Sequence, residues 1–166
     1  MRLLFFIYLF FALQILNAQD SRDFYGSNTY FEIDTLNISI NQLEQKLISS
    51  HKRKKLPKIL VVVHFAGASC EMDRIKKLSN KYKFRIIEDA SHAIGGDFNN
   101  YKVGSCKYSD ITVFSFHPVK IITSGEGGIA LTNNKDLAKS MSYLRSHGII
   151  RDKKVLNNSE QFTPCK

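Results

Sequence analysis

The sequence predicts an α/β fold in which a mostly parallel sheet is flanked by helices. Two observations indicate it. Apolar runs of strand length alternate along the chain with longer segments whose apolar residues recur at helical spacing. The 166 residues, 43% hydrophobic and 23% charged, are enough for one domain with a buried core. Strands that alternate with helices pair in parallel and are joined by right-handed crossovers.

The first predicted elements are a short strand and a helix. Residues 29–33 are a strand candidate, because aromatic and β-branched residues are concentrated there. Residues 41–49 are predicted to form a helix that places Leu43, Leu47 and Ile48 on one face.

A strand and a second helix follow. Residues 59–63 form a continuous aliphatic run, which is typical of a strand covered on both faces. Residues 71–81 are predicted to form a helix with one packing face. The residues of that face are Met72, Ile75, Lys76 and Leu78.

The later part of the chain repeats the alternation. Strands are predicted at residues 84–87, 111–116 and 129–132, and a helix at residues 136–145. The residues expected to face inward from this last helix are Leu137, Met141 and Leu144.

The two ends of the chain depart from this pattern. Residues 1–18 are largely apolar, and two interpretations stay open: a signal-like segment, or a buried element of a truncated domain. The apolar run is too short for a confident membrane span. Residues 19–152 are expected to form one partial domain, and residues 153–166 an irregular, truncated tail.

The net charge of +9 raises the possibility of a nucleic-acid partner, but the sequence does not favour it. The dense basic cluster at residues 51–55 follows the predicted helix 41–49, where positive charge complements the helix dipole in a solvated turn. A polyanion contact is the alternative, and no nucleic-acid recognition motif accompanies the cluster. The cysteines, Cys70, Cys106 and Cys165, have no metal-ligand spacing, so no metal site is expected.

An acid, a hydroxyl and a lysine follow the ends of two predicted strands. Asp89 and Ser115 lie at strand ends, and Lys120 comes five residues after Ser115. Because ligands bind outside the carboxyl ends of parallel strands, these groups can face one bound molecule. The sequence therefore predicts a cofactor pocket at this edge, to which the turn at residues 125–128 adds flexible glycines.

Each candidate has a functional and a structural interpretation. Partial burial would favour the neutral, nucleophilic amine of Lys120, which can attack an aldehyde, although a lysine can also snorkel from a strand end. Asp89 can hold a proton on a pyridine nitrogen or cap a helix. His92 can reach the same ring or serve structurally, and Ser115 can bind a phosphate oxygen or simply pack.

Four segments together resemble the sugar-aminotransferase family named after DegT, DnrJ, EryC1 and StrS. They are residues 88–93 (EDASHA), 114–120 (FSFHPVK), 125–128 (GEGG) and 145–149 (RSHGI). The resemblance implies part of the large domain of the aspartate-aminotransferase-like fold, known as fold type I, with pyridoxal 5'-phosphate as cofactor.

The resemblance also implies roles for the candidate residues. Lys120 would bind the cofactor covalently and shuttle protons, Asp89 would pair with the pyridinium nitrogen, and Ser115 would bind the phosphate. His92 falls where many relatives have glutamine near the phenolic oxygen of the cofactor. Related sugar dehydratases carry histidine at the position of Lys120, so the lysine favours amino transfer over dehydration.

Within the family, residues 109–152 are most similar to members that act on a UDP-linked 4-keto-6-deoxy-N-acetylhexosamine in pseudaminic acid biosynthesis. The expected activity is transfer of an amino group from glutamate to such a sugar, for surface glycan or flagellin glycosylation. A cytoplasmic homodimer is expected for the full-length enzyme, with no nucleic-acid or membrane partner. The chain is about half the length of family members and is expected to be inactive alone. The alternative is an exported or membrane-tethered noncatalytic protein, secreted if residues 1–18 act as a signal peptide.

Overall fold

The computed structural model describes residues 31–32, 34–147 and 149. The chain divides into two compact units. One unit, residues 29–135, contains the sheet. The described residues of the other unit include helix α4 (Lys135–Arg145), except that Lys135 belongs to the first unit. The segments predicted at residues 1–18 and 153–166 lie outside the described residues.

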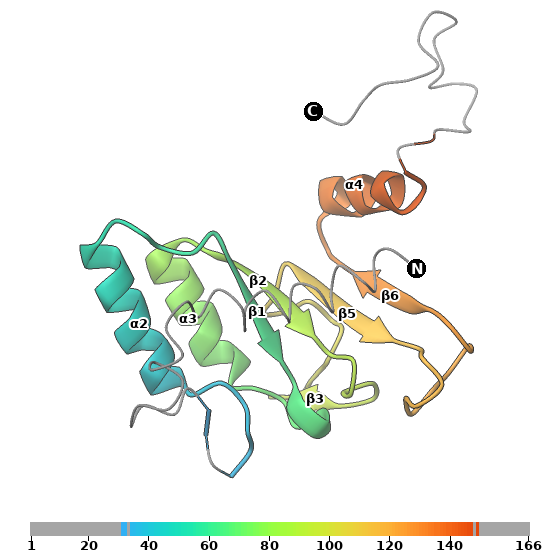
Figure 1. Ribbon diagram of the computed structural model, residues 1–166, viewed down its shortest axis with the longest axis horizontal. Coiled ribbons are helices and arrows are strands. Elements are labelled where there is room, and N and C mark those ends of the chain that lie inside the picture. The colour runs from blue at the N-terminus through green and yellow to red at the C-terminus, as the bar shows by residue number, and fades with distance from the viewer. Residues whose placement is uncertain (1–30, 33, 148, 150–166) are drawn as a thin grey trace, which may run out of the picture. The chain divides into compact units, whose positions relative to one another are not determined.

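The sheet of the first unit is mostly parallel, as predicted. Its described strands lie in the order β1-β2-β5-β6, with β6 alone antiparallel to its neighbour (Figure 1). Their bounds are β1 Ile59–Val63, β2 Arg85–Asp89, β5 Ile111–Ser115 and β6 Gly128–Leu131. The central strands, β2 and β5, are the ones that end in the predicted site residues Asp89 and Ser115.

The register of the strands separates two faces of the sheet. Glu88 is aligned with Val62 on β1 and Thr112 on β5, and Asp89 is aligned with Val63 and Val113. Successive side chains of a strand point to opposite faces. Glu88 therefore points to the face that the helices cover, called here the helix face, and Asp89 points to the opposite face, called the Asp89 face.

Helices α2 (Ile40–Lys52) and α3 (Met72–Tyr82) cover the helix face beside β1 and β2 (Figure 1). Their apolar stripes meet Val62 and Ile86 from the strands in one core. Burial of this apolar surface is the main stabilising term of the unit. The other buried members of the core are Ile40, Leu43, Leu47, Cys70, Met72, Ile75, Leu78, Tyr82 and Phe84.

Two packing expectations for these elements are wrong. Ile48 is 41% exposed, because the buried stripe of α2 runs through Ile40, Leu43 and Leu47 and the residue after Leu47 is turned about 100° away from it. In β1 only Val62 is buried and Ile59 is 50% exposed, so the strand is not covered on both faces. It is an edge strand of the described sheet.

The segment before α2 also differs from expectation. Within the predicted strand 29–33, the structure describes Phe31 and Glu32, and Phe31 makes only an isolated antiparallel bridge with Ile38. A tight turn intervenes, in which the Leu36 amide donates to the Glu32 carbonyl and Leu36 has a φ of 54°. At Phe31 and Glu32 the structure thus shows a bridge and the start of a turn, and the rest of the predicted strand lies outside the described residues.

A small hairpin was missed by the sequence analysis. Strands β3 (Asp97–Phe98) and β4 (Tyr101–Lys102) pair antiparallel, and Asn99 and Asn100 join them with φ values of 48° and 65°. Two positive φ angles define the tight hairpin turn that asparagine tolerates well. The Asn-Asn pair was the available sequence signal.

Helix α4 forms as predicted but has no buried residue. Leu137 and Met141 are half-buried and Leu144 is 60% exposed, so the expectation that this stripe lies inward is wrong for the described chain. Periodicity identifies an apolar stripe without identifying what covers it.

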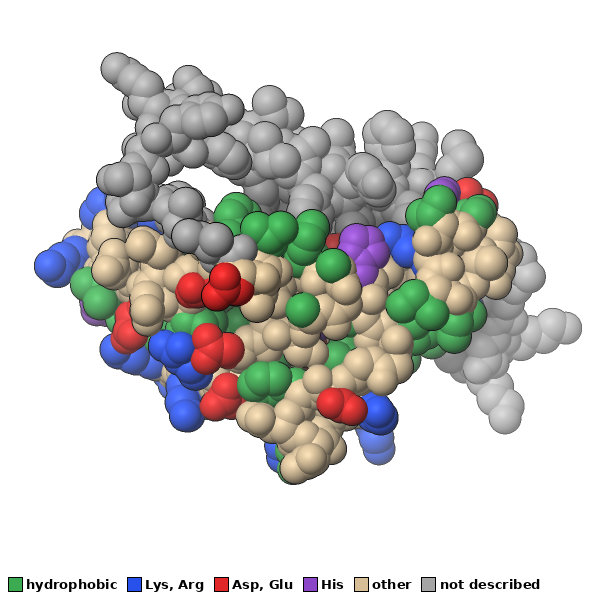
Figure 2. Space-filling view, turned by 90° about the horizontal axis from the view of Figure 1, so that it is seen from below, with side chains coloured by type: hydrophobic (Ala, Val, Ile, Leu, Met, Phe, Trp, Pro, Cys, Tyr) green, Lys and Arg blue, Asp and Glu red, His purple; other side chains and the backbone are tan. Residues whose placement is uncertain are grey.

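Two observations concern charge and membranes. Residues 51–55 are all exposed, in agreement with a solvated end of α2, and on the face drawn in Figure 2 basic side chains lie among acidic ones. Among the described residues, no helix is both long and apolar enough to cross a membrane.

Candidate active site

Asp89 ends β2 with one carboxylate oxygen held and the other available. Its Oδ1 accepts hydrogen bonds from the Ser91 amide at 3.1 Å and the Ser91 hydroxyl at 2.6 Å. No described residue donates to Oδ2, although the residue is only 9% exposed. A turn follows rather than a helix, so Asp89 orders this turn and is not a helix cap.

Ser115 lies on the same face as Asp89, one strand away. Asp89 is aligned with Val113, and Ser115 is two residues further along β5. Because side chains alternate with a period of two, the Ser115 hydroxyl points to the Asp89 face at the same carboxyl edge. This hydroxyl accepts a long hydrogen bond, 3.4 Å, from the His117 amide, and the residue is half-buried.

Lys120 lies in the loop between β5 and β6. Its amide donates to the His117 carbonyl at 2.9 Å, and the base of the loop is closed where the Phe116 amide donates to the Gly127 carbonyl at 2.9 Å. Lys120 is half-buried, whereas its neighbours Val119 and Ile121 are 78% and 74% exposed. Lys120 is thus partly buried, although the apolar residues on either side of it are largely exposed. No described residue forms an ion pair or hydrogen bond with its ammonium group.

His92 is exposed in the turn after β2, and its imidazole makes no hydrogen bond with another described residue. Its backbone, however, approaches the loop after β1. A side chain added at Gly67, which has a φ of 89°, would place its Cβ 3.0 Å from the His92 carbonyl oxygen. The loops after β1 and β2 are therefore packed closely, and Gly67 permits this approach.

Residues 28–162 match the DegT/DnrJ/EryC1/StrS aminotransferase family. The chain belongs to this family. A UDP-4-amino-4,6-dideoxy-N-acetyl-beta-L-altrosamine transaminase from Campylobacter jejuni is 45% identical over 115 residues, which are 69% of this chain and 29% of the relative.

Two solved structures extend the comparison. Helicobacter pylori PseC, an aminotransferase involved in the biosynthesis of pseudoaminic acid, has a TM-score of 0.69 at 31% identity and covers 83% of this chain and 34% of its own. NtdA from Bacillus subtilis, with bound cofactor PMP, has a TM-score of 0.58 at 31% identity over 74% of this chain and 26% of its own. The chain thus spans about a third or less of these relatives, and its fold is part of fold type I.

Pyridoxal phosphate is the cofactor of DegT/DnrJ/EryC1/StrS aminotransferases, and the residues present fit it. The Asp89 face offers a carboxylate oxygen without a partner among the described residues, a hydroxyl one strand away and a lysine in the following loop. A carboxylate can pair with the ring nitrogen of the cofactor, and a hydroxyl can donate to its phosphate. An amine can react with its aldehyde.

A buried polar network on the helix face was missed by the sequence analysis of this family member. His64 Nε2 lies 2.8 Å from Glu88 Oε2, and Thr112 donates to Glu88 Oε1 at 3.1 Å. All three residues are at most 5% exposed. The sequence does show polar residues at the ends of apolar strands. Which face Glu88 and Asp89 each occupy becomes known only from the register of the strands.

The hydrogen bonds determine the charge state of this network. The Cys70 amide donates to His64 Nδ1 at 3.1 Å, so Nδ1 is the acceptor and the ring proton is on Nε2, which donates to Glu88. Burial alone would raise the pKa of Glu88, but hydrogen bonds from His64, Ser109 and Thr112 outweigh burial and lower it. Glu88 is therefore a buried carboxylate with both oxygens bound.

Two cysteines border the network. Burial raises the pKa of the Cys70 thiol to about 11, and its Sγ lies 3.1 Å from the Val63 carbonyl oxygen as a donor. The Cys106 Sγ lies 3.4 Å from Thr112 Oγ1. A thiol with a raised pKa is a weak nucleophile, so Cys70 packs and donates rather than reacts.

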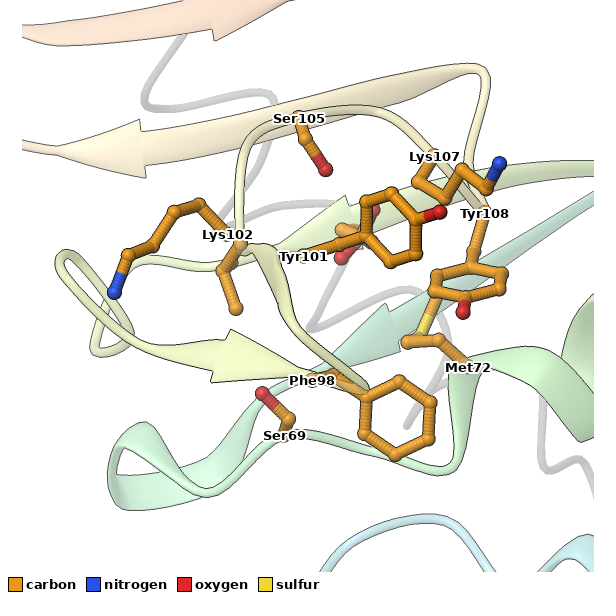
Figure 3. Close-up of a pocket in the computed structure, with 10 residues that line it drawn as sticks. Ser69, Met72, Phe98, Tyr101, Lys102, Ser105, Lys107 and Tyr108 are labelled. Carbon is orange, nitrogen blue, oxygen red and sulfur yellow. The ribbon is translucent and has the colours of Figure 1, made fainter.

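The pocket drawn in Figure 3 contains none of the four predicted site residues. It lies beside the β3–β4 hairpin, and Glu88 and Met72 contribute to its wall, which places it next to the helix face. Aromatic rings surround it: Tyr108 meets Phe98 and Tyr101 edge-on at centroid distances of 5.8 and 6.0 Å. These rings shield the Glu88 side of the sheet rather than the Asp89 face.

Proposed function

We propose that this chain is part of a pyridoxal-phosphate-dependent aminotransferase that transfers an amino group from glutamate to a UDP-linked 4-keto-6-deoxy sugar. The sugar would serve surface glycan or flagellin glycosylation. The observation that carries the proposal is the available Asp89 Oδ2 beside Ser115 on one face, with Lys120 in the next loop. The altrosamine transaminase at 45% identity supports the choice of substrate class.

The proposed roles follow from the chemistry of each group. Asp89 Oδ2 would accept the ring N–H, while Ser91 holds Oδ1 and so sets the direction of the carboxylate. Ser115 would donate to the phosphate, and His92 would flank the ring. Lys120 would bind the aldehyde carbon and then move a proton between carbon atoms. When bound, pyridoxal phosphate supplies the aldehyde and an electron-withdrawing ring.

The proposal extends to the whole protein. We place it in the cytoplasm as a homodimer, where nucleotide sugars and glutamate are available. For these 166 residues alone we propose no turnover, because the residues that match cover only 29% and 34% of the relatives' own lengths. Amino transfer from glutamate by the isolated chain would contradict that part, and cleavage after Ala18 in the natural product would favour export instead.

Chemical trapping tests the cofactor site even if binding is weak. The chain is incubated with pyridoxal phosphate, reduced with borohydride and digested, and the labelled lysines are quantified by mass spectrometry. Lys120 is expected to be labelled about tenfold or more above Lys77, whose side chain is 79% exposed, because a bound cofactor raises the effective concentration at one amine.

The matched variant is Asp89→Asn, which keeps the size of the side chain and removes its charge. It should reduce labelling of Lys120 and leave labelling of Lys77 unchanged. Equal labelling of the two lysines in the unaltered chain would refute the proposed site.

A further inference from the structure

The end of β2 is held on both sides by its neighbours. On the helix face, the Glu88 carboxylate accepts a hydrogen bond of 2.8 Å from His64, which follows β1, and one of 3.1 Å from Thr112 of β5. Each carboxylate oxygen has its own partner, and the carboxylate is charged, so the hydrogen bonds are stronger than those between neutral groups. Strands β1, β2 and β5 are thus joined at their carboxyl edge.

His64 also contacts the neighbouring residue, Asp89, directly. The His64 amide donates to the Asp89 carbonyl at 3.1 Å, while its imidazole donates to Glu88. The imidazole is itself fixed, because the Cys70 amide donates to Nδ1. His64 therefore restrains the Asp89 backbone through its amide and the Glu88 carboxylate through its imidazole.

We propose that His64 and Glu88 are positioning residues for Asp89: the buried pair fixes the end of β2 so that the Asp89 carboxylate points out of the opposite face toward the cofactor. This inference rests on the proposed function for the identity of the ligand. Side chains of adjacent strand residues point to opposite faces, so a rotation of the strand end that moves Glu88 also moves Asp89. Hydrogen bonds to the residues that support a functional group determine how precisely that group is oriented.

Three variants separate positioning from general stability. Glu88→Met keeps the length of the side chain and removes both hydrogen bonds. Glu88→Gln retains them, because its oxygen accepts from His64 and its amide donates to Thr112, whose hydroxyl turns toward Cys106. Ile86→Val is the control, since Ile86 is fully buried on the same face of β2 and its side chain makes no hydrogen bond.

The first readout needs no cofactor. The Ser91 amide donates to Asp89 Oδ1. Hydrogen exchange of this amide therefore reports the orientation of the Asp89 carboxylate. At temperatures equally far below each melting point, Glu88→Met should speed this exchange about tenfold, as expected for loss of one hydrogen bond. Glu88→Gln and Ile86→Val should stay within about twofold of the unaltered chain. Equal exchange in Glu88→Met and Ile86→Val would overturn the inference.

The second readout is the labelling of Lys120 by pyridoxal phosphate relative to Lys77. The preference should fall in Glu88→Met and be retained in Glu88→Gln and Ile86→Val. If the unaltered chain shows no preference, the proposed function fails while the exchange experiment still decides the positioning role. If the preference exists and Glu88→Met retains it, the positioning role fails and the proposed function stands.

Discussion

Glu88 and Asp89 are adjacent acids with different environments. Glu88 is enclosed by His64 and Thr112 on the helix face, whereas Asp89 on the other face has one oxygen held by Ser91 and one available. The sequence indicated that an acid at this strand end could bind a ring nitrogen. It could not indicate which of two neighbours does so without the family resemblance, because the register decides which face each occupies.

The buried carboxylate makes stability depend on pH. The pKa of Glu88 in the folded chain lies below its ordinary value of 4.5, so its contribution to stability is present above that value and is lost as the pH falls through the folded pKa. Urea unfolding at about pH 7 and about pH 4 should therefore show a larger loss in the unaltered chain than in Glu88→Gln.

The control for this comparison is Glu126→Gln, at an exposed position of the β5–β6 loop. It should lose stability between the two pH values as the unaltered chain does. An equally steep loss in Glu88→Gln would show that Glu88 is not the group responsible.

Most elements of the sheet unit were predictable because their signals are local. Strand β1 has the predicted bounds, and α2, α3, β2, β5 and β6 differ from them by a few residues at their ends. The failures depend on partners distant in sequence. Phe31 makes only an isolated bridge with Ile38, and helix α4 has no buried residue. Local periodicity carries no information about such partners.

The junction of β5 and β6 depends on one glycine. Gly128 is aligned with Ser115, and an added Cβ would lie 2.7 Å from the Phe114 carbonyl oxygen, a backbone atom of the paired strand. Gly128→Ala should therefore destabilise the chain by about 1–3 kcal/mol, as expected for overpacking. Thermal or urea unfolding measures it. Ala130→Ser, at an exposed position of the same strand, should change stability by less than about 0.5 kcal/mol. Equal effects of the two substitutions would exclude the backbone clash.

At the scale of the whole molecule, the candidate site combines a sheet edge with a loop. The positions of Asp89 and Ser115 on one face follow from strand ends, which the sequence predicted, and from the parallel register, which it did not specify. The conformation of the Lys120 loop depends on hydrogen bonds such as the one from the Phe116 amide to the Gly127 carbonyl, which periodicity cannot reveal. Convergence of Lys120 and Asp89 on one cofactor stays a prediction.

The protonation of the cofactor ring tests that prediction most directly. The chain is labelled at Lys120 with ¹⁵N pyridoxal phosphate, reduced with borohydride so that the adduct is permanent, and titrated by ¹⁵N NMR. In the unaltered chain the ring nitrogen should stay protonated to a higher pH than in Asp89→Asn, because a nearby carboxylate stabilises the pyridinium charge. Asp97→Asn, which removes a carboxylate that pairs with Lys102, is the control and should match the unaltered chain. The same titration in the unaltered chain and in Asp89→Asn would contradict the account, because Asp89 and Lys120 would then not act on one ring.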